Sequence, residues 1–130
     1  MGHTTLEESQ VLMGLGVSYE TADMHHIDCG SFFTTALGYF TNLDEIDDKY
    51  YPCWSLNALI SLFAVGNDAP VFTLTRCGTD IKTEQHNNDW YAEWEDDKTY
   101  LVFNDVRAVG AVIKLIEKLV KDYGVNYLKQ

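Results

Sequence analysis

The sequence predicts an α+β domain in which about three helices pack on a three-stranded antiparallel meander. Apolar residues recur with a helical period of about 3.6 in three segments and alternate with a strand period of about 2 in three others. We expect helices at about 5–15, 55–65 and 105–123, and strands at about 71–75, 90–95 and 99–103. The 130 residues fit one domain, 1–130, and 46% hydrophobic residues are enough for a globular core.

The segment 52–63 gives the clearest local signal of the chain. Ser55 is a good N-cap, because its hydroxyl can accept an orphan backbone N–H of the first helical turn. Trp54 and Leu59 then occupy the two positions of a hydrophobic staple, and Gly66 suits the end of the helix. The buried face is formed by Leu56, Leu59, Ile60 and Phe63.

The N-terminal 50 residues give weaker signals. Thr5 with Glu8, or Thr4 with Glu7, fits a capping box at the start of the first helix. The segments that follow are expected to form a short helical turn at 17–24, a strand or extended segment at 32–40, and a solvated acidic loop at 42–49.

In the C-terminal half, alternating residues predict three strands. Phe72 and Leu74 are expected to face the core from the first strand, and Trp90, Ala92 and Trp94 from the second. The polar segment 78–88 is expected to be a loop, and 95–98 the turn of a hairpin.

The last predicted helix is the longest. Asn104 or Asp105 is expected to cap it, and Gly124 to end it, with 126–128 docking back on the core. Its apolar stripe consists of Val109, Val112, Ile113, Ile116, Leu119, Val120 and Tyr123.

The net charge of −11 is distributed unevenly. Residues 1–48 carry nine acidic residues and no Lys or Arg, whereas 106–130 carry five basic residues against two acidic ones. We therefore expect basic side chains of the last helix to face acidic ones near the N-terminus and leave the remaining surface negative. The pairs expected are Lys114, Lys118 and Lys121 with Glu7, Glu8 or the 44–48 loop.

This charge also limits the partners. A nucleic acid or an anionic membrane is bound through clustered cations, so we expect neither as a partner. No apolar run approaches the roughly 20 residues needed to span a bilayer, and the N-terminus lacks the basic and apolar regions of a signal peptide. These features predict a cytoplasmic protein, in which Cys29, Cys53 and Cys77 are reduced thiols.

His25, His26 and Cys29 are the candidates for metal or thiol chemistry, with Asp23 and Asp28 close by. Imidazole and thiolate bind zinc, but a structural site needs four ligands and no second pair follows. The 44–48 loop lacks the glycine and distal glutamate of an EF-hand, and no phosphate-binding loop or nucleophile elbow is present. We therefore predict no catalytic residue, metal or cofactor. The alternative is a small metal- or thiol-dependent enzyme built around these three residues.

The chain is rich in aromatic residues, with three Trp, eight Tyr and six Phe. Tyr50, Tyr51 and Tyr91 are the candidate partner-binding residues, since tyrosine is a common interface anchor, and the segment 32–40 could extend the patch. The favoured function is a non-enzymatic module that binds a protein, and the acidic surface favours a basic one. An inhibitor that mimics DNA is a special case suggested by charge. The sequence leaves the oligomeric state open.

Three groups of residues carry a resemblance to known proteins: 15–17 with 21–24, the segment 52–59, and the closing 126–129. With these markers the chain resembles small acidic proteins carried by phages, prophages and mobile elements of gut bacteria, a family without an assigned activity. The resemblance spans most of the chain and implies a bacterial intracellular accessory protein. It carries over no catalytic residue.

Overall fold

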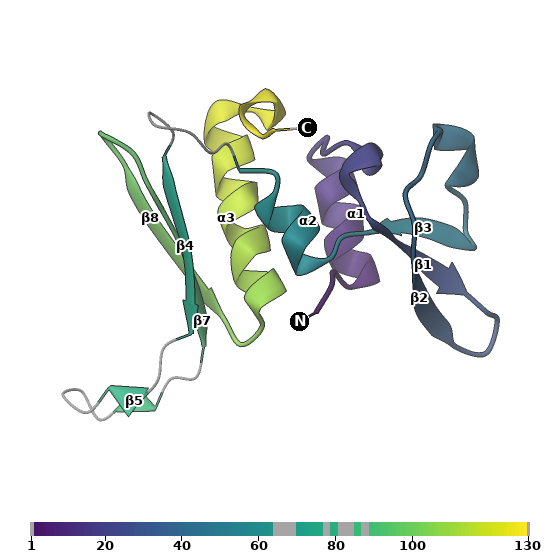
Figure 1. Ribbon diagram of the computed structural model, residues 1–130, viewed down its shortest axis with the longest axis horizontal. Coiled ribbons are helices and arrows are strands. Elements are labelled where there is room, and N and C mark those ends of the chain that lie inside the picture. The colour runs from purple at the N-terminus through teal and green to yellow at the C-terminus, as the bar shows by residue number, and fades with distance from the viewer. Residues whose placement is uncertain (1, 64–69, 77–78, 81–84, 87–88, 130) are drawn as a thin grey trace.

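The protein is an α+β structure in which three helices lie between two three-stranded antiparallel sheets (Figure 1). The computed structural model describes residues 2–63, 70–76, 79–80, 85–86 and 89–129. The α+β class is confirmed, but the expectation of one meander was wrong, because a second sheet forms within the first 53 residues.

The N-terminal sheet consists of β1 (Met24–Asp28), β2 (Phe33–Leu37) and β3 (Tyr50–Cys53), in the order β2-β1-β3. Only β2 falls within a segment expected to be extended. Periodicity missed β1 because both faces of this strand are partly covered, so polar and apolar residues do not alternate along it. It missed β3 because Pro52 lies inside that strand, at a sheet edge where a missing N–H is tolerated.

Helix α1 (Leu6–Gly14) begins with the predicted capping box. The Thr5 hydroxyl accepts the Glu8 N–H at 3.1 Å, and the Glu8 carboxylate accepts the Thr5 N–H at 2.8 Å. The 3₁₀ turn η1 (Tyr19–Thr21) lies in the expected helical turn. A second 3₁₀ turn, η2 (Leu43–Glu45), interrupts the segment expected to be a loop.

Helix α2 (Leu56–Ile60) confirms Ser55 as its N-cap, because the Ser55 hydroxyl accepts the Ala58 N–H at 3.1 Å. Trp54, Leu59 and Leu62 are almost completely buried around it. The proposed stop at Gly66 lies outside the described residues.

The second sheet confirms the predicted meander, with β4 (Val71–Arg76), β7 (Trp90–Glu95) and β8 (Tyr100–Asp105) in that order. Ala92 and Trp94 are buried as expected, and Phe72 and Leu74 pack against the same core. The segment expected to be a polar loop contains a short antiparallel pair, β5 (Thr79–Asp80) with β6 (Gln85–His86).

Helix α3 (Ala108–Tyr123) covers one face of the second sheet (Figure 1). The prediction of Asn104 or Asp105 as its N-cap was wrong, because β8 continues through both residues and the helix starts after Arg107. Asp105 still supports this end, since its Oδ1 accepts the Arg107 N–H at 2.9 Å.

The C-terminal end of α3 follows the prediction. Gly124 ends the helix with a φ of 87°, a backbone conformation that favours glycine. The turn η3 (Val125–Tyr127) then brings Leu128 into the core, and the Lys129 N–H donates to the Leu62 carbonyl at 2.7 Å.

The hydrophobic core joins the helices to the second sheet. It is formed mainly by side chains of α1, α2, α3 and β7 that are less than one-tenth exposed. Its largest fully buried members are Trp54, Trp94, Leu12, Leu59, Leu62, Leu115, Ile116 and Leu119.

The expected pairing of the lysines of α3 with N-terminal acids was wrong. Lys114 pairs at 3.1 Å with Asp105, which ends β8 just before the helix, and Lys118 pairs at 3.2 Å with Asp122, one helical turn further along α3. Arg107, just before the helix, reaches the N-terminus instead and binds Glu8 at 3.0 Å. Within the described part of the chain, no helix has the length and apolar character needed to cross a membrane.

Candidate functional site

The structure separates the three candidates for metal or thiol chemistry. His25 and His26 are neighbours in β1, and successive side chains of a strand point to opposite faces of the sheet. Cys29 is exposed in the turn between β1 and β2. Among the described residues, no group of three or more His, Cys, Asp or Glu side chains is arranged to hold a metal ion.

His26 belongs to a buried polar network under α1. Its Nε2 lies 3.1 Å from the Ser9 hydroxyl, which in turn lies 2.7 Å from the Thr4 hydroxyl. The Thr4 hydroxyl also accepts the Trp54 N–H at 3.0 Å. Burial, followed by the nearby His3, lowers the pKa of His26, so the ring is held in its neutral form.

Cys53 contacts the same network from β3. Its thiol is 3.6 Å from the Thr4 carbonyl, and burial raises the pKa of this thiol to about 11. A thiol with this pKa carries little thiolate at neutral pH and is a poor nucleophile. Ser9 is fully buried, so a substrate cannot reach its hydroxyl in this structure. The network connects α1 to β1 and β3 and has the features of a structural element.

His25 points to the other face of the sheet, where it lines an acidic cavity of about 410 Å³. Its ring stacks on Phe40, with centroids 3.9 Å apart, and Phe40 is almost completely buried. Tyr50 of β3 lies on the same sheet face, opposite the neighbouring Ile27. The cavity is completed by three carboxylates of the segment after β2: Asp44, Glu45 and Asp47. We call these six lining residues the acidic cavity.

Two of the three carboxylates are held in place by the backbone. Oε1 of Glu45 accepts the Thr41 hydroxyl and the Thr41 and Asn42 N–H groups, the latter two at 3.0 and 3.1 Å. These bonds, that of the Thr41 hydroxyl first, lower the pKa of Glu45 and keep it ionised at neutral pH.

Oδ1 of Asp47 accepts the Lys49 and Tyr50 N–H groups, both at 2.8 Å. In Glu45 and Asp47 alike, these donors all reach one carboxylate oxygen, which leaves the second oxygen of each group outside these hydrogen bonds. Two of the carboxylates are therefore ordered before any ligand arrives.

The three candidate tyrosines do not form one surface. Tyr50 lines the acidic cavity, and the Lys49 ammonium lies 5.5 Å from its ring centroid. Tyr51 is half-buried on the opposite sheet face, paired with His26, and burial raises the pKa of its hydroxyl. Tyr91 lies in β7, on the sheet face that points away from the buried Ala92 and Trp94.

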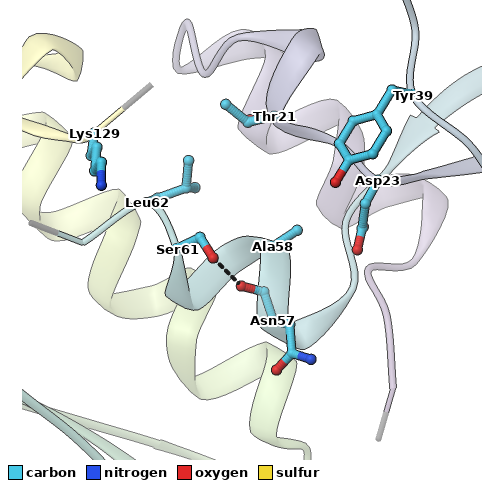
Figure 2. Close-up of a pocket in the computed structure, with 8 residues that line it drawn as sticks. All are labelled: Thr21, Asp23, Tyr39, Asn57, Ala58, Ser61, Leu62 and Lys129. Atoms are coloured by element: carbon cyan, nitrogen blue, oxygen red, sulfur yellow. Dashed lines mark hydrogen bonds between the residues drawn. The ribbon is translucent and has the colours of Figure 1, made fainter.

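A second cavity, of about 400 Å³, lies beside α2 (Figure 2). Asp23, Asn57, Ser61 and Lys129 contribute its polar groups, with Tyr39 at one side. Several of these groups serve the fold already. Asp23 accepts two hydrogen bonds from Ser55, and the Ser61 hydroxyl donates to the Asn57 carbonyl at 2.8 Å.

No protein-family model, curated protein or solved structure matches the chain. The candidate site therefore rests on the geometry of this chain alone.

Sequence reasoning identified part of the acidic cavity and missed the rest. The sequence indicates Tyr50 as a partner-binding candidate and predicts a solvated loop for the acidic residues. The pairing of Asn42 with Glu45, three residues on, is a capping-box pattern that could have revealed the ordered turn. Nothing local indicated that Phe40 stacks on His25, because this contact depends on how the chain returns across the sheet.

Proposed function

We propose that this protein is a non-enzymatic binding module that takes a basic side chain of a partner protein into the acidic cavity. The observation that carries the proposal is the convergence of the three carboxylates, Asp44, Glu45 and Asp47, beside the rings of Tyr50 and His25.

A guanidinium or ammonium group suits this arrangement on two counts. Carboxylates form charge-assisted hydrogen bonds to cationic donors, and an aromatic face attracts a cation within about 6 Å of its centroid. Lys49 already places its ammonium against Tyr50 in this way. Arginine fits best, since its planar fork can bind a carboxylate and stack on a ring together.

The separation of His25, His26 and Cys29 supports a binding module over the rival enzyme. A metal site or an activated thiol needs its groups within bonding distance of one another. Here His26 is engaged with Ser9, His25 is stacked on Phe40, and Cys29 is in an exposed turn.

The experiment titrates the isotope-labelled protein with a short arginine-containing peptide and follows the backbone amide signals by NMR. We expect the shifts to concentrate in residues 40–50 and to weaken as salt rises, because an exposed ion pair is screened. Shifts confined to β7 and β8 would place the binding surface at Tyr91 and contradict the proposal.

Three single variants sharpen the experiment. Asp44→Asn removes a cavity carboxylate, and the turn is held by the side chains of Asn42, Glu45 and Asp47 instead, so this variant should weaken binding without disturbing the turn. Asp48→Asn is the matched control, because Asp48 is an exposed acid of the same segment outside the cavity. Lys49→Ala should strengthen binding, because it removes the resident cation from Tyr50. Equal effects of Asp44→Asn and Asp48→Asn would indicate only a general charge effect.

A further inference from the structure

The β1–β2 hairpin has an exposed apolar edge formed by β2, and no residue of β2 lines the acidic cavity. In β2, Phe33 is 64% exposed and Leu37 is 84% exposed. The segment 29–41, which contains β2 and its flanking turns, has no charged residue, although the whole chain carries a net charge of −11. The hairpin extends away from α2 and α3 (Figure 1).

The open edge of β2 presents a regular row of backbone groups. The Gly38 N–H donates to the Asp23 carbonyl, and the Cys29 N–H donates to the Phe32 carbonyl, both at 2.9 Å. In an antiparallel pair hydrogen-bonded positions alternate, so Thr34 and Ala36 bond to β1. The N–H and C=O groups of Phe33, Thr35 and Leu37 therefore point to the open edge.

The other edge strands of the two three-stranded sheets carry features that oppose strand addition. Pro52 removes a donor from β3, Arg76 places a charge at the end of β4, and β8 ends in Asn104 and Asp105. Charged residues and proline are the usual means by which edge strands avoid pairing with another chain. β2 contains neither.

The sequence of β2, Phe-Thr-Thr-Ala-Leu, is complementary to itself in the antiparallel sense. With a two-fold axis at Thr35, Phe33 lies opposite Leu37 of the partner subunit. Thr34 lies opposite Ala36 of the partner subunit, and Thr35 opposite its own copy. In this register the outward N–H and C=O groups of the two β2 strands form hydrogen-bonded pairs. Phe33 also faces Leu37 of the partner subunit twice, and an aromatic residue opposite an aliphatic one is a favourable cross-strand pair.

We propose that two copies of this chain associate through β2 to form a symmetric dimer with a continuous six-stranded sheet. An isologous contact of this kind closes on itself and leaves no further free edge on β2. We take the occupant to be a second copy because β2 is complementary to itself in this register. In addition, the uncharged segment 29–41 lets two acidic molecules meet here without repulsion between like charges. The two-fold axis is perpendicular to the sheet, so both acidic cavities lie on one face of the dimer. The dimer does not depend on the proposed function.

Charge substitutions at the paired positions test the register. Sedimentation equilibrium should give twice the monomer mass for the unmodified protein at submillimolar concentration. Phe33→Lys with Leu37→Lys sets like charges opposite each other twice and should weaken dimerisation about tenfold or more. Phe33→Lys with Leu37→Glu makes the same positions complementary and should restore the dimer.

Each outcome decides the proposal. A monomeric unmodified protein overturns it, as does a dimer that survives the two lysines. Circular dichroism of the lysine variant establishes that it is folded, which is expected because both side chains are exposed. If the double-lysine variant unfolds, the variant Phe33→Lys with Leu37→Glu provides the test instead. That variant is expected to dimerise, so a folded but monomeric Phe33→Lys, Leu37→Glu protein would also overturn the proposal.

Disulfide trapping tests the two-fold axis directly. In a background with Cys29→Ser and Cys77→Ser, Thr35→Cys should crosslink two copies, because hydrogen-bonded pairs lie about 5.5 Å apart at Cα, within disulfide range. Thr34→Cys is the matched control. It lies diagonal to its own copy at about 7–8 Å and should not crosslink. Crosslinking at residue 34 but not 35 would overturn the register.

Discussion

Both carboxylate oxygens of Asp23 accept hydrogen bonds from Ser55. Oδ1 accepts the Ser55 N–H at 2.9 Å, and Oδ2 accepts the Ser55 hydroxyl. The Ser55 hydroxyl oxygen accepts the Ala58 N–H in turn. Asp23, which directly precedes β1, therefore fixes the cap of α2 and connects the N-terminal sheet to the central helix.

Asp23→Ala should lower the free energy of unfolding by about 2–3 kcal/mol, because it removes two bonds to a charged acceptor and leaves the cap hydroxyl without its partner. Asp48→Ala, at an exposed position, should change it by less than about 0.5 kcal/mol. Urea unfolding of the two variants measures the difference. Equal losses would mean that the Asp23 bonds add nothing to stability.

His26 should make the protein less stable in mild acid. Burial, followed by His3, lowers the pKa of His26 from its ordinary value of 6.5, so the unfolded chain binds a proton more readily than the folded one. The contribution of His26 to stability is complete above pH 6.5 and is lost as the pH falls below this value. The free energy of unfolding should therefore decrease between about pH 7.5 and 5.5, above the carboxyl range.

The variant His26→Gln assigns this pH dependence. Gln can still bond to Ser9 but does not titrate, so the slope of stability against pH should become smaller. Urea titrations at several pH values measure the slope. An unchanged slope would show that another group is responsible.

Two helical glycines should respond to alanine in opposite directions. At Gly14 in α1 an added Cβ meets nothing within 4 Å, so Gly14→Ala should stabilise the protein by about 0.5–1 kcal/mol. At Gly110 in α3 the added Cβ would lie 2.5 Å from Oδ1 of Asp105. Displacing Asp105 breaks its bonds to Arg107 and Lys114, so Gly110→Ala should lower the free energy of unfolding by about 1 kcal/mol. Thermal unfolding of both variants provides the comparison.

Asp105 should also titrate differently in Gly110→Ala. Burial acts to raise the pKa of this carboxyl, but the Arg107 N–H and Lys114 outweigh it, and the net effect is a lowered pKa. Losing these contacts should raise the pKa of Asp105, which NMR titration of the carboxyl can follow. An unchanged pKa would mean that alanine fits without moving Asp105.

Cys29 and Cys53 should differ sharply in reactivity. Cys29 is exposed, whereas Cys53 is buried and the pKa of its thiol is raised to about 11. Iodoacetamide at neutral pH should modify Cys29 rapidly and Cys53 only on unfolding, as peptide mass analysis can show. Rapid modification of Cys53 in the folded protein would contradict the buried network.

Elements that rest on short-range chemistry were predictable from the sequence. The Ser55 cap and the Thr5–Glu8 capping box involve residues three positions apart, so their pattern is visible in a few letters. The C-terminal meander was predictable because one face of each strand packs on α3. That one-sided burial imposes the alternation seen at Ala92 and Trp94.

The N-terminal sheet and the acidic cavity were not predictable in this way. β1 has both faces partly covered, by α1 on one side and by Phe40 on the other, so its residues show no alternation. β2 is exposed on both faces and has no buried set to indicate its period. The cavity joins His25 of β1 with Tyr50 of β3, a neighbourhood that exists only once the two strands pair.

Local sequence chemistry thus accounts for the starts of α1 and α2, the end of α3 at Gly124 and the faces of the second sheet, because each depends on contacts within a few residues or on burial of one face. Only the tertiary structure determined that His25 and His26 lie in one strand with their side chains on opposite faces. It also determined that Arg107 pairs with Glu8, 99 positions away. The physical reason is range: side-chain direction follows strand pairing, and an ion pair forms with whichever charge the folded chain brings within about 4 Å.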